Sequence, residues 1–289
     1  MEQAATNHNI QLIKILEKVN ELAVLPHVVF QVLELSGNDD TSIASLERAI
    51  IVDPGFSSRV LILANSAYSG LPKRVTSIKE AVNFLGFKAV RQLAMTVGVF
   101  DLFAGKTDNE SLRRRAWWRH SVDSAVCCHY LAQKTGKLPP DEAYTCGLLH
   151  NIGRTLLDRC SEVDYAAVER LIKVGRTLEE AELTVYHCTS TQIAVAAIRK
   201  WKLPEQLASG VNYRHEPTPE DDFLIHRACT ALGSVIADLA VNGISANGPQ
   251  YSSAPLWALQ ILDIDPASVD ELVAECAQKI RENSSAGHF

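Results

Sequence analysis

A histidine followed by an asparagine carries the clearest chemical signal in the sequence. Residues 148–153 read Leu-Leu-His-Asn-Ile-Gly, so that His150 precedes Asn151. A His-Asp pair can bind a divalent cation through an imidazole and a carboxylate side by side, because hard cations are held largely by charged or strongly donating ligands. Asparagine keeps the size of aspartate and one carbonyl oxygen, but it contributes no negative charge. The other residues around this pair therefore decide whether a metal site survives.

The composition limits the classes of protein to consider. The chain has 289 residues, 47% of them hydrophobic, and can bury one large core or two modest ones. Its net charge of -6 gives no overall attraction to nucleic acid or anionic lipid. No apolar run approaches the roughly 20 residues that span a bilayer, and the polar start is unlike a signal peptide. We expect a cytoplasmic protein with no membrane partner and no general affinity for nucleic acid.

Helix start and stop signals recur along the chain, without the period-2 alternation of a half-buried strand. Asp53-Pro54 places a capping carboxylate before a proline, and capping-box spacing occurs at Ser77–Glu80, Thr177–Glu180 and Ser268–Glu271. The sequence therefore predicts an all-α fold. The expected helices are 9–20, 27–36, 42–52, 53–68, 77–86, 87–103, 111–135, 141–158, 162–174, 178–200, 204–213, 221–240 and 267–283.

Two polar stretches divide this helical pattern into parts. Residues 104–110 form the best candidate boundary between two packed helical lobes, and residues 241–250 look like a surface loop. We therefore expect an N-terminal lobe over residues 1–106, a second helical lobe over 107–240 and a C-terminal helical extension over 241–289. Seven cysteines without a Cys-x-x-Cys pair indicate reduced, buried thiols.

Several separated segments, taken in order, resemble one family. The segments are Leu25-Pro26, Asp53-Pro54, Leu63-Ala-Asn-Ser-Ala-Tyr68, Ser77-Ile78, Ala81-Val-Asn-Phe-Leu-Gly86, Val90-Arg-Gln-Leu93, Trp118-Arg-His120-Ser121, Ala143-Tyr-Thr-Cys-Gly147-Leu-Leu-His-Asn-Ile-Gly153 and Trp201-Lys-Leu-Pro204. Over roughly residues 19–217 the chain is similar to the HDOD domain, the HD-related output domain of bacterial signalling proteins. The resemblance implies that the second lobe is an HD-like helical bundle, related to HD phosphohydrolases and cyclic-di-GMP phosphodiesterases.

The resemblance also allows each expected metal ligand to be compared with this sequence. His120 and His150 match the first two histidines of an active HD enzyme, whereas Asn151 replaces the aspartate. Arg154 stands where enzymatic relatives often have a lysine, and so keeps the charge with a different donor geometry.

The remaining ligand positions depart further from the enzymatic pattern. Ser190 takes the place of a histidine found in two-metal relatives, and Arg214-His215 takes the place of a His-His pair. The alignment puts Cys229 at the final aspartate. Two carboxylates are therefore absent, and with them the negative charge that would hold a cation and ionise its bound water.

These departures predict a vestigial site without catalytic residues or a resident cofactor. In this interpretation His120 and His150 are inherited core histidines, hydrogen-bonded between helices. The alternative is a mononuclear site formed by His120, His150, His215 and Cys229, which would hold a divalent metal such as Zn, Mn, Mg or Fe.

Two further motifs have both structural and functional interpretations. Asn65-Ser66 is typical of the family pattern and is expected to form a polar cap or an interlobe hydrogen bond, with a ligand contact as the alternative. The stretch 113–119, Arg-Arg-Arg-Ala-Trp-Trp-Arg, is expected to turn one tryptophan into the core and its arginines toward solvent. The alternative for this stretch is phosphate and base contact by a nucleic-acid-binding regulator.

The sequence thus favours a non-catalytic bacterial signalling module that binds a protein partner or a small regulatory ligand. The competing hypothesis is a metal-dependent phosphohydrolase that acts on a nucleotide or cyclic dinucleotide through a rearranged site.

Overall fold

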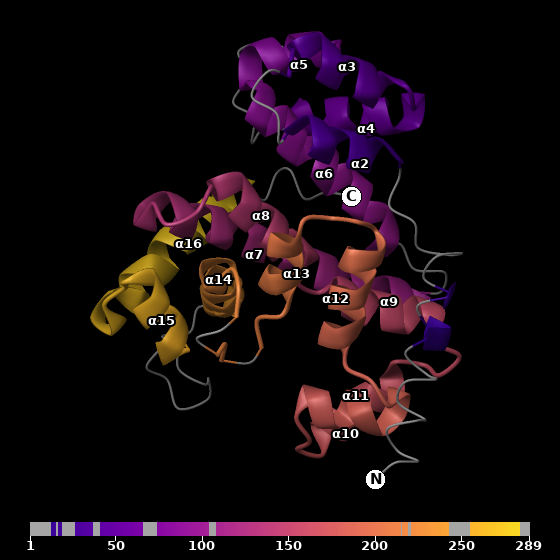
Figure 1. The fold of residues 1–289 in the computed structure, drawn as a ribbon, viewed down its shortest axis with the longest axis vertical. Helices are drawn as coiled ribbons and strands as arrows, with labels where there is room; N and C mark the ends of the chain where they lie inside the picture. Colours follow the sequence, from indigo (N-terminus) through magenta and orange to yellow (C-terminus); the bar gives the residue numbers. More distant parts are fainter. Residues whose placement is uncertain are drawn as a thin grey trace.

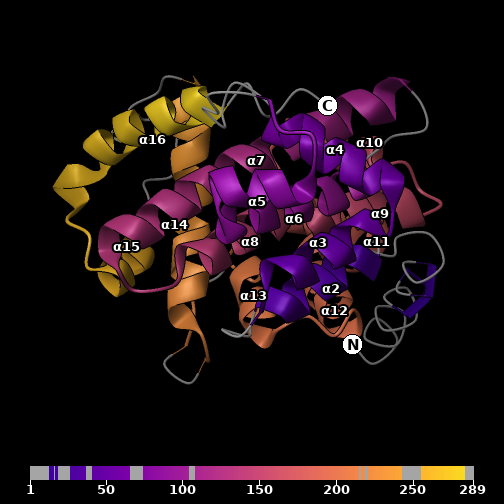
Figure 2. The same cartoon turned by 90° about the horizontal axis from the view of Figure 1, so that it is seen from above.

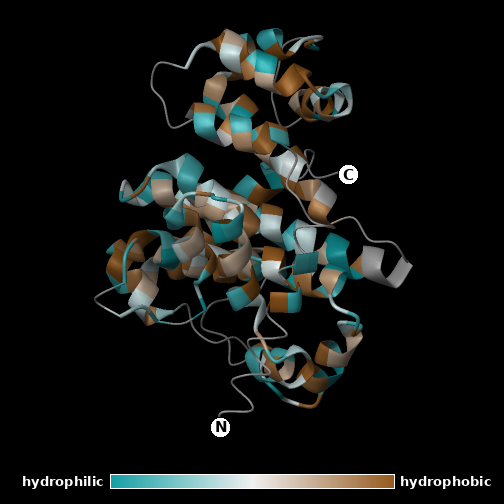
Figure 3. Cartoon of the chain, turned by 45° about the vertical axis from the view of Figure 1, so that its right-hand side comes forward, coloured by the Kyte–Doolittle hydropathy of each residue, from teal (hydrophilic) through white to brown (hydrophobic). Residues whose placement is uncertain are grey.

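The computed structural model describes residues 13–15, 17–18, 27–36, 41–65, 74–103, 108–214, 216–218, 221–242 and 255–283. Helices joined by short loops make up these residues, and no strand occurs among them. The all-α prediction is confirmed. The helices carry both hydrophobic and hydrophilic stretches (Figure 3), as expected for helices that pack one face against a core.

Helices α2 to α6 form the first lobe, at one end of the molecule (Figure 1). Two of their starts follow the predicted capping residues, because Asp53 accepts from the N–H of Phe56 and Ser77 from that of Glu80. The helices are α2 (His27–Ser36), α3 (Ile43–Ile51), α4 (Pro54–Ala64), α5 (Ile78–Leu85) and α6 (Phe87–Phe103).

The second lobe lies below the first in Figure 1, with α6 running between them. The hairpin of α10 and α11 lies at the end of the molecule opposite the first lobe. The helices of the second lobe are α7 (Asp108–Thr135), α8 (Pro140–Leu149), α9 (Ile152–Cys160), α10 (Ala166–Lys173), α11 (Leu178–Tyr186), α12 (Ser190–Lys200), α13 (Glu205–Val211) and α14 (Leu224–Asn242).

The C-terminal part forms α15 (Leu256–Leu262), a 3-10 turn (Pro266–Ser268) and α16 (Val269–Asn283). These helices lie along one side of α7 and α14 (Figures 1 and 2). The helix α15 was not predicted from the sequence. Ser268, the expected cap of the last helix, is the final residue of the 3-10 turn, and that turn is capped by Asp265, whose carboxylate accepts from the N–H of Ala267.

Two clusters of buried apolar side chains fill the interior. The larger one continues from the first lobe into the second, so that Val29 and Phe56 belong to the same cluster as Leu148 and Ile193. The smaller cluster joins α7 and α14 to the C-terminal helices. The candidate boundary at 104–110 only partly falls on described residues, since 104–107 lie outside them and 108–110 begin α7. The lobe limits therefore stay a prediction, and residues 243–250 of the expected surface loop also lie outside the described chain.

Two of the expected helices are each divided in two, and both breaks matter for the site. The expected helix 141–158 breaks at His150 and Asn151, which separate α8 from α9. The expected helix 178–200 breaks because His187 adopts a left-handed conformation, with φ at 57°, and Thr189 then caps α12 through a capping box with Gln192.

The longest apolar helix is buried in the protein. By length and composition α14 alone among the described helices could cross a membrane, which corrects the expectation that no such run exists. However, 67% of its apolar window is buried inside the structure, as in the core helix of a folded protein. All seven cysteines are buried and free, as predicted.

Candidate functional site

The two histidines singled out in the sequence come together at the centre of the second lobe. His120 lies on α7 and His150 follows the last residue of α8, and their ring centroids are 5.0 Å apart at an interplanar angle of 74°. Nδ1 of His150 lies 2.5 Å from the carbonyl oxygen of Gly147. Because a carbonyl can only accept, we place the ring proton on Nδ1, which leaves Nε2 as an acceptor. That Nε2 is buried without a hydrogen-bond partner.

His120 is held from both sides by residues of α14. Its Nδ1 lies 3.1 Å from Oδ1 of Asp238, and its Nε2 lies 3.2 Å from Oγ of Ser234. The hydroxyl of Ser124 approaches the same Nε2 at 3.4 Å. Nε2 of His120 is therefore hydrogen-bonded to protein side chains, and Nδ1 lies within ion-pair distance of a carboxylate.

Asn151 occupies the position after His150 without replacing the missing charge. It is only 2% exposed, it precedes the first residue of α9, and its side chain makes no capping hydrogen bond. Its Nδ2 is buried and has no partner in the structure. Two consecutive residues, His150 and Asn151, thus each bury one polar atom without a partner.

The electrostatic environment keeps His150 neutral. Burial is the largest cause that lowers the pKa of His150 well below its usual range, and His120, Arg214 and Arg154 act in the same direction. The guanidinium of Arg214 lies over the ring of Tyr213, 5.0 Å from its centroid, and Tyr213 in turn packs against His150. Asp238, the carboxylate in contact with this pair, has a half-exposed side chain.

Two other predicted positions, Arg154 and Ser190, point into a separate network. Nε of Arg154 donates to the hydroxyl of Tyr165 over 3.1 Å, and that hydroxyl donates to Oε1 of Glu182 over 2.7 Å. The other oxygen of Glu182 accepts from both the N–H and the hydroxyl of Ser190. Arg154 also stacks on Trp117, 4.7 Å from its centroid. Both positions therefore join α9 to α11 and α12.

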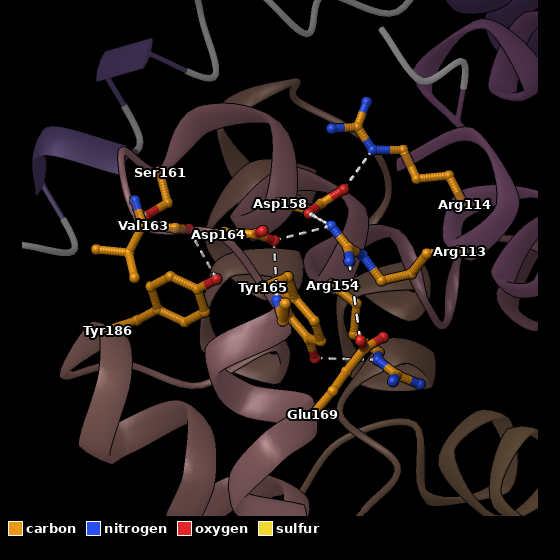
Figure 4. Close-up of polar contacts among 11 residues, drawn as sticks. Arg113, Arg114, Arg154, Asp158, Ser161, Val163, Asp164, Tyr165, Glu169 and Tyr186 are labelled. Atoms are coloured by element: carbon orange, nitrogen blue, oxygen red, sulfur yellow. Dashed lines mark hydrogen bonds and ion pairs between the residues drawn. The ribbon is translucent and has the colours of Figure 1, made fainter. Parts of the chain in front are cut away.

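The first two arginines of the 113–119 stretch, Arg113 and Arg114, form ion pairs (Figure 4). Arg113 and Arg114 both bind the buried carboxylate of Asp158, over 2.6 Å and 2.5 Å, and Arg113 also reaches Asp164. Trp117 and Trp118 are both buried, which corrects the expectation that only one would face the core. Arg113 and Arg114, predicted to line solvent, thus lie partly in the interior, because acidic partners on α9 and the following loop neutralise them, whereas Arg115 and Arg119 are exposed as predicted.

Cys229 lies away from the histidine pair, contrary to the expectation from alignment. Its thiol donates to the carbonyl oxygen of Cys128, in the cluster that joins α7, α14 and α16. The α14 side chains that face His120 are instead Ser234 and Asp238. Five residues of helix separate Cys229 from Ser234, a rotation of about 140°, so the two lie on different faces. Ser234 and Asp238 are four residues apart and so lie on one face of α14. This spacing is the sequence pattern from which their common position beside His120 could have been predicted.

Asn65 has a structural role within the first lobe. Its amide donates to the carbonyl oxygens of Leu61 and Val75, and its Oδ1 accepts from the N–H of Val75, all within 2.9 Å. These bonds make it a polar cap, one of the two roles expected, and connect the end of α4 to the segment before α5. Ser66 and His215 lie outside the described residues.

The described side chains do not fit the metal centre of an active HD enzyme. No group of three or more His, Cys, Asp or Glu residues in the described part of the chain could hold a metal ion. Nε2 of His120 is hydrogen-bonded to Ser234, the residues at 151 and 234 are uncharged, and the carboxylate near Nδ1, Asp238, is half exposed. The mononuclear set of His120, His150, His215 and Cys229 does not assemble around Cys229, and His215 is not described.

Comparison with known proteins identifies the family. A model of the HDOD domain matches residues 22–217, more than half of the chain. The chain belongs to the HDOD family. An uncharacterized protein of Treponema pallidum (strain Nichols) is 26% identical to this HDOD protein over 210 residues, which are 70% of this chain and 39% of the relative. The chain thus spans about two fifths of the length of that relative.

Crystal structures of similar proteins share the fold. A protein of Shewanella amazonensis named "Putative phosphohydrolase" is 25% identical, with a TM-score of 0.72, and the match covers 94% of this HDOD protein and 98% of the other chain. A "Putative signal transduction protein" of Marinobacter aquaeolei is 20% identical, with a TM-score of 0.77, over 98% of this chain and 65% of the other.

Proposed function

We propose that this protein is a non-catalytic module of bacterial signal transduction, built on an HD scaffold whose metal site is degenerate. It acts by binding a protein partner or a small regulatory ligand. The observation that carries the proposal is Asn151, which puts a buried, uncharged amide next to His150 where a divalent cation needs a carboxylate.

The surroundings of His120 support the same proposal. A metal ligand needs a free ring nitrogen directed at the ion, whereas Nε2 of His120 is hydrogen-bonded to Ser234. The Asp238 carboxylate near Nδ1 is a contact that metal-ligating histidines also make, so the support comes from Nε2. Ser234 is neutral, so that α14 adds no buried negative charge to the pair. Asp238 is half exposed, and water screens its charge.

The network around Glu182 provides a third line of support. Ser190 and Arg154 occupy positions that serve metal or phosphate binding in enzymatic relatives, and here both hold helices together. Their hydrogen-bonding groups are used within the protein, which leaves fewer groups for a substrate phosphate.

The alternative function is metal-dependent phosphohydrolysis of a nucleotide or cyclic dinucleotide. The similarity to the Shewanella amazonensis protein, whose name describes a phosphohydrolase, favours this alternative. In that case Asp238 would have to leave His120 and serve as a metal ligand together with His150.

Metal analysis combined with an activity assay separates the two functions. The protein is purified without chelator, its metal content is measured, and a panel of nucleotides and cyclic dinucleotides is incubated with it and added Mn²⁺. We expect sub-stoichiometric metal and no turnover above that of a His150→Ala variant. One bound metal per chain, with turnover that His150→Ala abolishes, would overturn the proposal and establish the enzyme.

A further inference from the structure

A second candidate site lies where the two lobes meet the C-terminal helix. A cleft of about 190 Å³ opens between α6, α7, α8 and α16, away from the residues of the His120–His150 site. Each part of the molecule contributes to it, since α6 belongs to the first lobe and α16 to the C-terminal extension. Its main lining residues are Gln92, Val126, His129, Tyr130, Tyr144 and Lys279.

The walls of this cleft are suited to a flat ring. His129 and Tyr144 lie edge to face, with ring centroids 6.4 Å apart, and Tyr130 lines the same space. Val126 adds an aliphatic surface on α7. Aromatic side chains gain most from planar partners that stack on them or meet them edge-on.

The polar groups of the cleft can recognise both donors and acceptors. Nε2 of Gln92 donates to Asp141 over 3.0 Å, which fixes the amide so that Oε1 is the atom left to accept, and no described residue donates to it. The ring of His129 makes no hydrogen bond to a described residue, and burial, the largest cause, lowers its pKa. A neutral imidazole offers one donor and one acceptor. The exposed amide of Gln133 adds one more group of each kind.

The charges at the mouth of the cleft cancel one another. Lys279 pairs with Glu282 over 3.1 Å, and both residues line the opening. Lys134, on the other side of Tyr130, is paired with Glu275 over 2.5 Å. The cleft therefore presents no unpaired cation to attract a phosphate or a carboxylate.

The size of the cleft limits the ligand to one or two rings. A protein cavity of about 150 Å³ accommodates a benzene molecule. A space of about 190 Å³ is thus large enough for a single ring with substituents or a small fused ring. A complete nucleotide would have to extend into solvent.

We propose that this cleft binds an uncharged planar heterocycle with an amide-type edge, the class that includes the nucleobases. The ring packs against the wall formed by His129, Tyr130 and Tyr144, and its edge pairs with the amide oxygen of Gln92. Such a ligand contacts both lobes and α16 at once, and so stabilises their docking. The proposal does not depend on the fate of the His120–His150 site.

Saturation-transfer NMR on the full chain tests this inference. Hypoxanthine and nicotinamide are the uncharged probes, and benzoate is an anionic ring of similar size. We expect saturation transfer to hypoxanthine or nicotinamide, with at least tenfold weaker transfer to benzoate. No transfer to either uncharged probe, or a preference for benzoate, would overturn the proposal.

Variants then locate the binding. His129→Leu removes the polar edge of the wall, and Val126→Phe fills the space from α7. Both are expected to weaken binding at least fivefold, whereas Gln260→Ala, which removes an exposed amide on α15, is expected to leave it unchanged. Thermal unfolding of each variant confirms that it folds. Folded His129→Leu and Val126→Phe proteins that bind the probes like the parent would contradict the assignment of the cleft.

Discussion

An amide and a hydroxyl stand at the two histidines of the candidate site. Asn151 follows His150 along the chain and Ser234 contacts His120, and neither supplies the negative charge that a hard dication requires. The sequence predicted the first of these, because Asn151 is adjacent to His150 along the chain. Ser234 could not be assigned in the same way, since its position depends on the rotation of α14 about its own axis relative to α7.

The buried carboxylate of Asp123, near His120, allows the cost of burying a charge to be tested. Asp123 lies one turn after His120 with a buried side chain, and burial, the largest cause, raises its pKa despite the ion pair with Arg119. The unfolded chain therefore loses this proton at lower pH than the folded protein does. The stability that the group contributes is complete below the unfolded pKa, near 3.9, and is lost as the pH rises through the folded pKa.

Asp123→Asn removes this titration. We expect the free energy of unfolding of the variant, relative to the parent, to increase between pH 4 and pH 7. Urea denaturation of both proteins at several pH values measures the difference. A variant that loses stability relative to the parent as the pH rises would show that the Arg119 pair outweighs burial.

At the scale of helices, two breaks shape the second lobe, one at His150 and Asn151 and one at His187. The polar network around Glu182 then joins the helices that these breaks create. Capping motifs at Ser77 and Thr177 allowed two helix starts to be predicted from local sequence. The break at His187 was missed because a left-handed histidine has no distinctive local pattern. The close packing of α9 on α12 was also not predicted, since it depends on Gly153, where a Cβ would lie 1.8 Å from the carbonyl oxygen of Ser190.

The hydroxyl of Tyr165 is the central link of the network around Glu182. Tyr165→Phe leaves the buried carboxylate of Glu182 without one donor and Arg154 without its acceptor. Hydrogen bonds to charged groups contribute roughly 1.5–3 kcal/mol, so we expect a loss of stability in that range. Tyr130→Phe removes the hydroxyl of a half-buried tyrosine from the more exposed carboxylate of Glu275, and as the matched control it should cost less than about 1 kcal/mol because water screens that bond. Equal effects of the two variants in urea denaturation would contradict the role of this network.

At the scale of the whole molecule, a polar seam joins the two lobes, formed by side chains of α6 and α8 in contact with each other. Asp141 on α8 accepts from Gln92 and pairs with Arg91 over 3.4 Å, and Thr96 on α6 shares a hydrogen bond with Tyr144. The all-α fold and the two-lobe pattern followed from helix signals in the sequence. This seam did not, because it joins side chains about 50 residues apart whose faces depend on how α6 docks.

Removing Asp141 tests whether the seam holds the lobes together. Asp141→Ala leaves Arg91 and Gln92 without their carboxylate in a largely buried setting, and we expect a loss of roughly 2–3 kcal/mol. Hydrogen exchange should increase in α6 and α8 before it does in α14. Asp222→Ala, at an exposed residue, is the control and should change stability by less than about 0.5 kcal/mol. Unchanged exchange in α6 would show that apolar packing alone fixes the lobes.

Calorimetric titration of Mn²⁺ tests the central claim most directly, namely that lost negative charge disabled the metal site. The parent is compared with the double variant Asn151→Asp/Ser234→Asp, which adds a carboxylate directly after His150 and a second one, besides Asp238, beside His120, and with Asn83→Asp, which adds a charge on the surface of α5. A charge close to a cation contributes on the order of 1–4 kcal/mol, so the double variant should bind at least about tenfold more tightly. We predict no saturable binding by the parent or by Asn83→Asp. Tight, stoichiometric binding by the parent, unaffected by the two added carboxylates, would contradict the account.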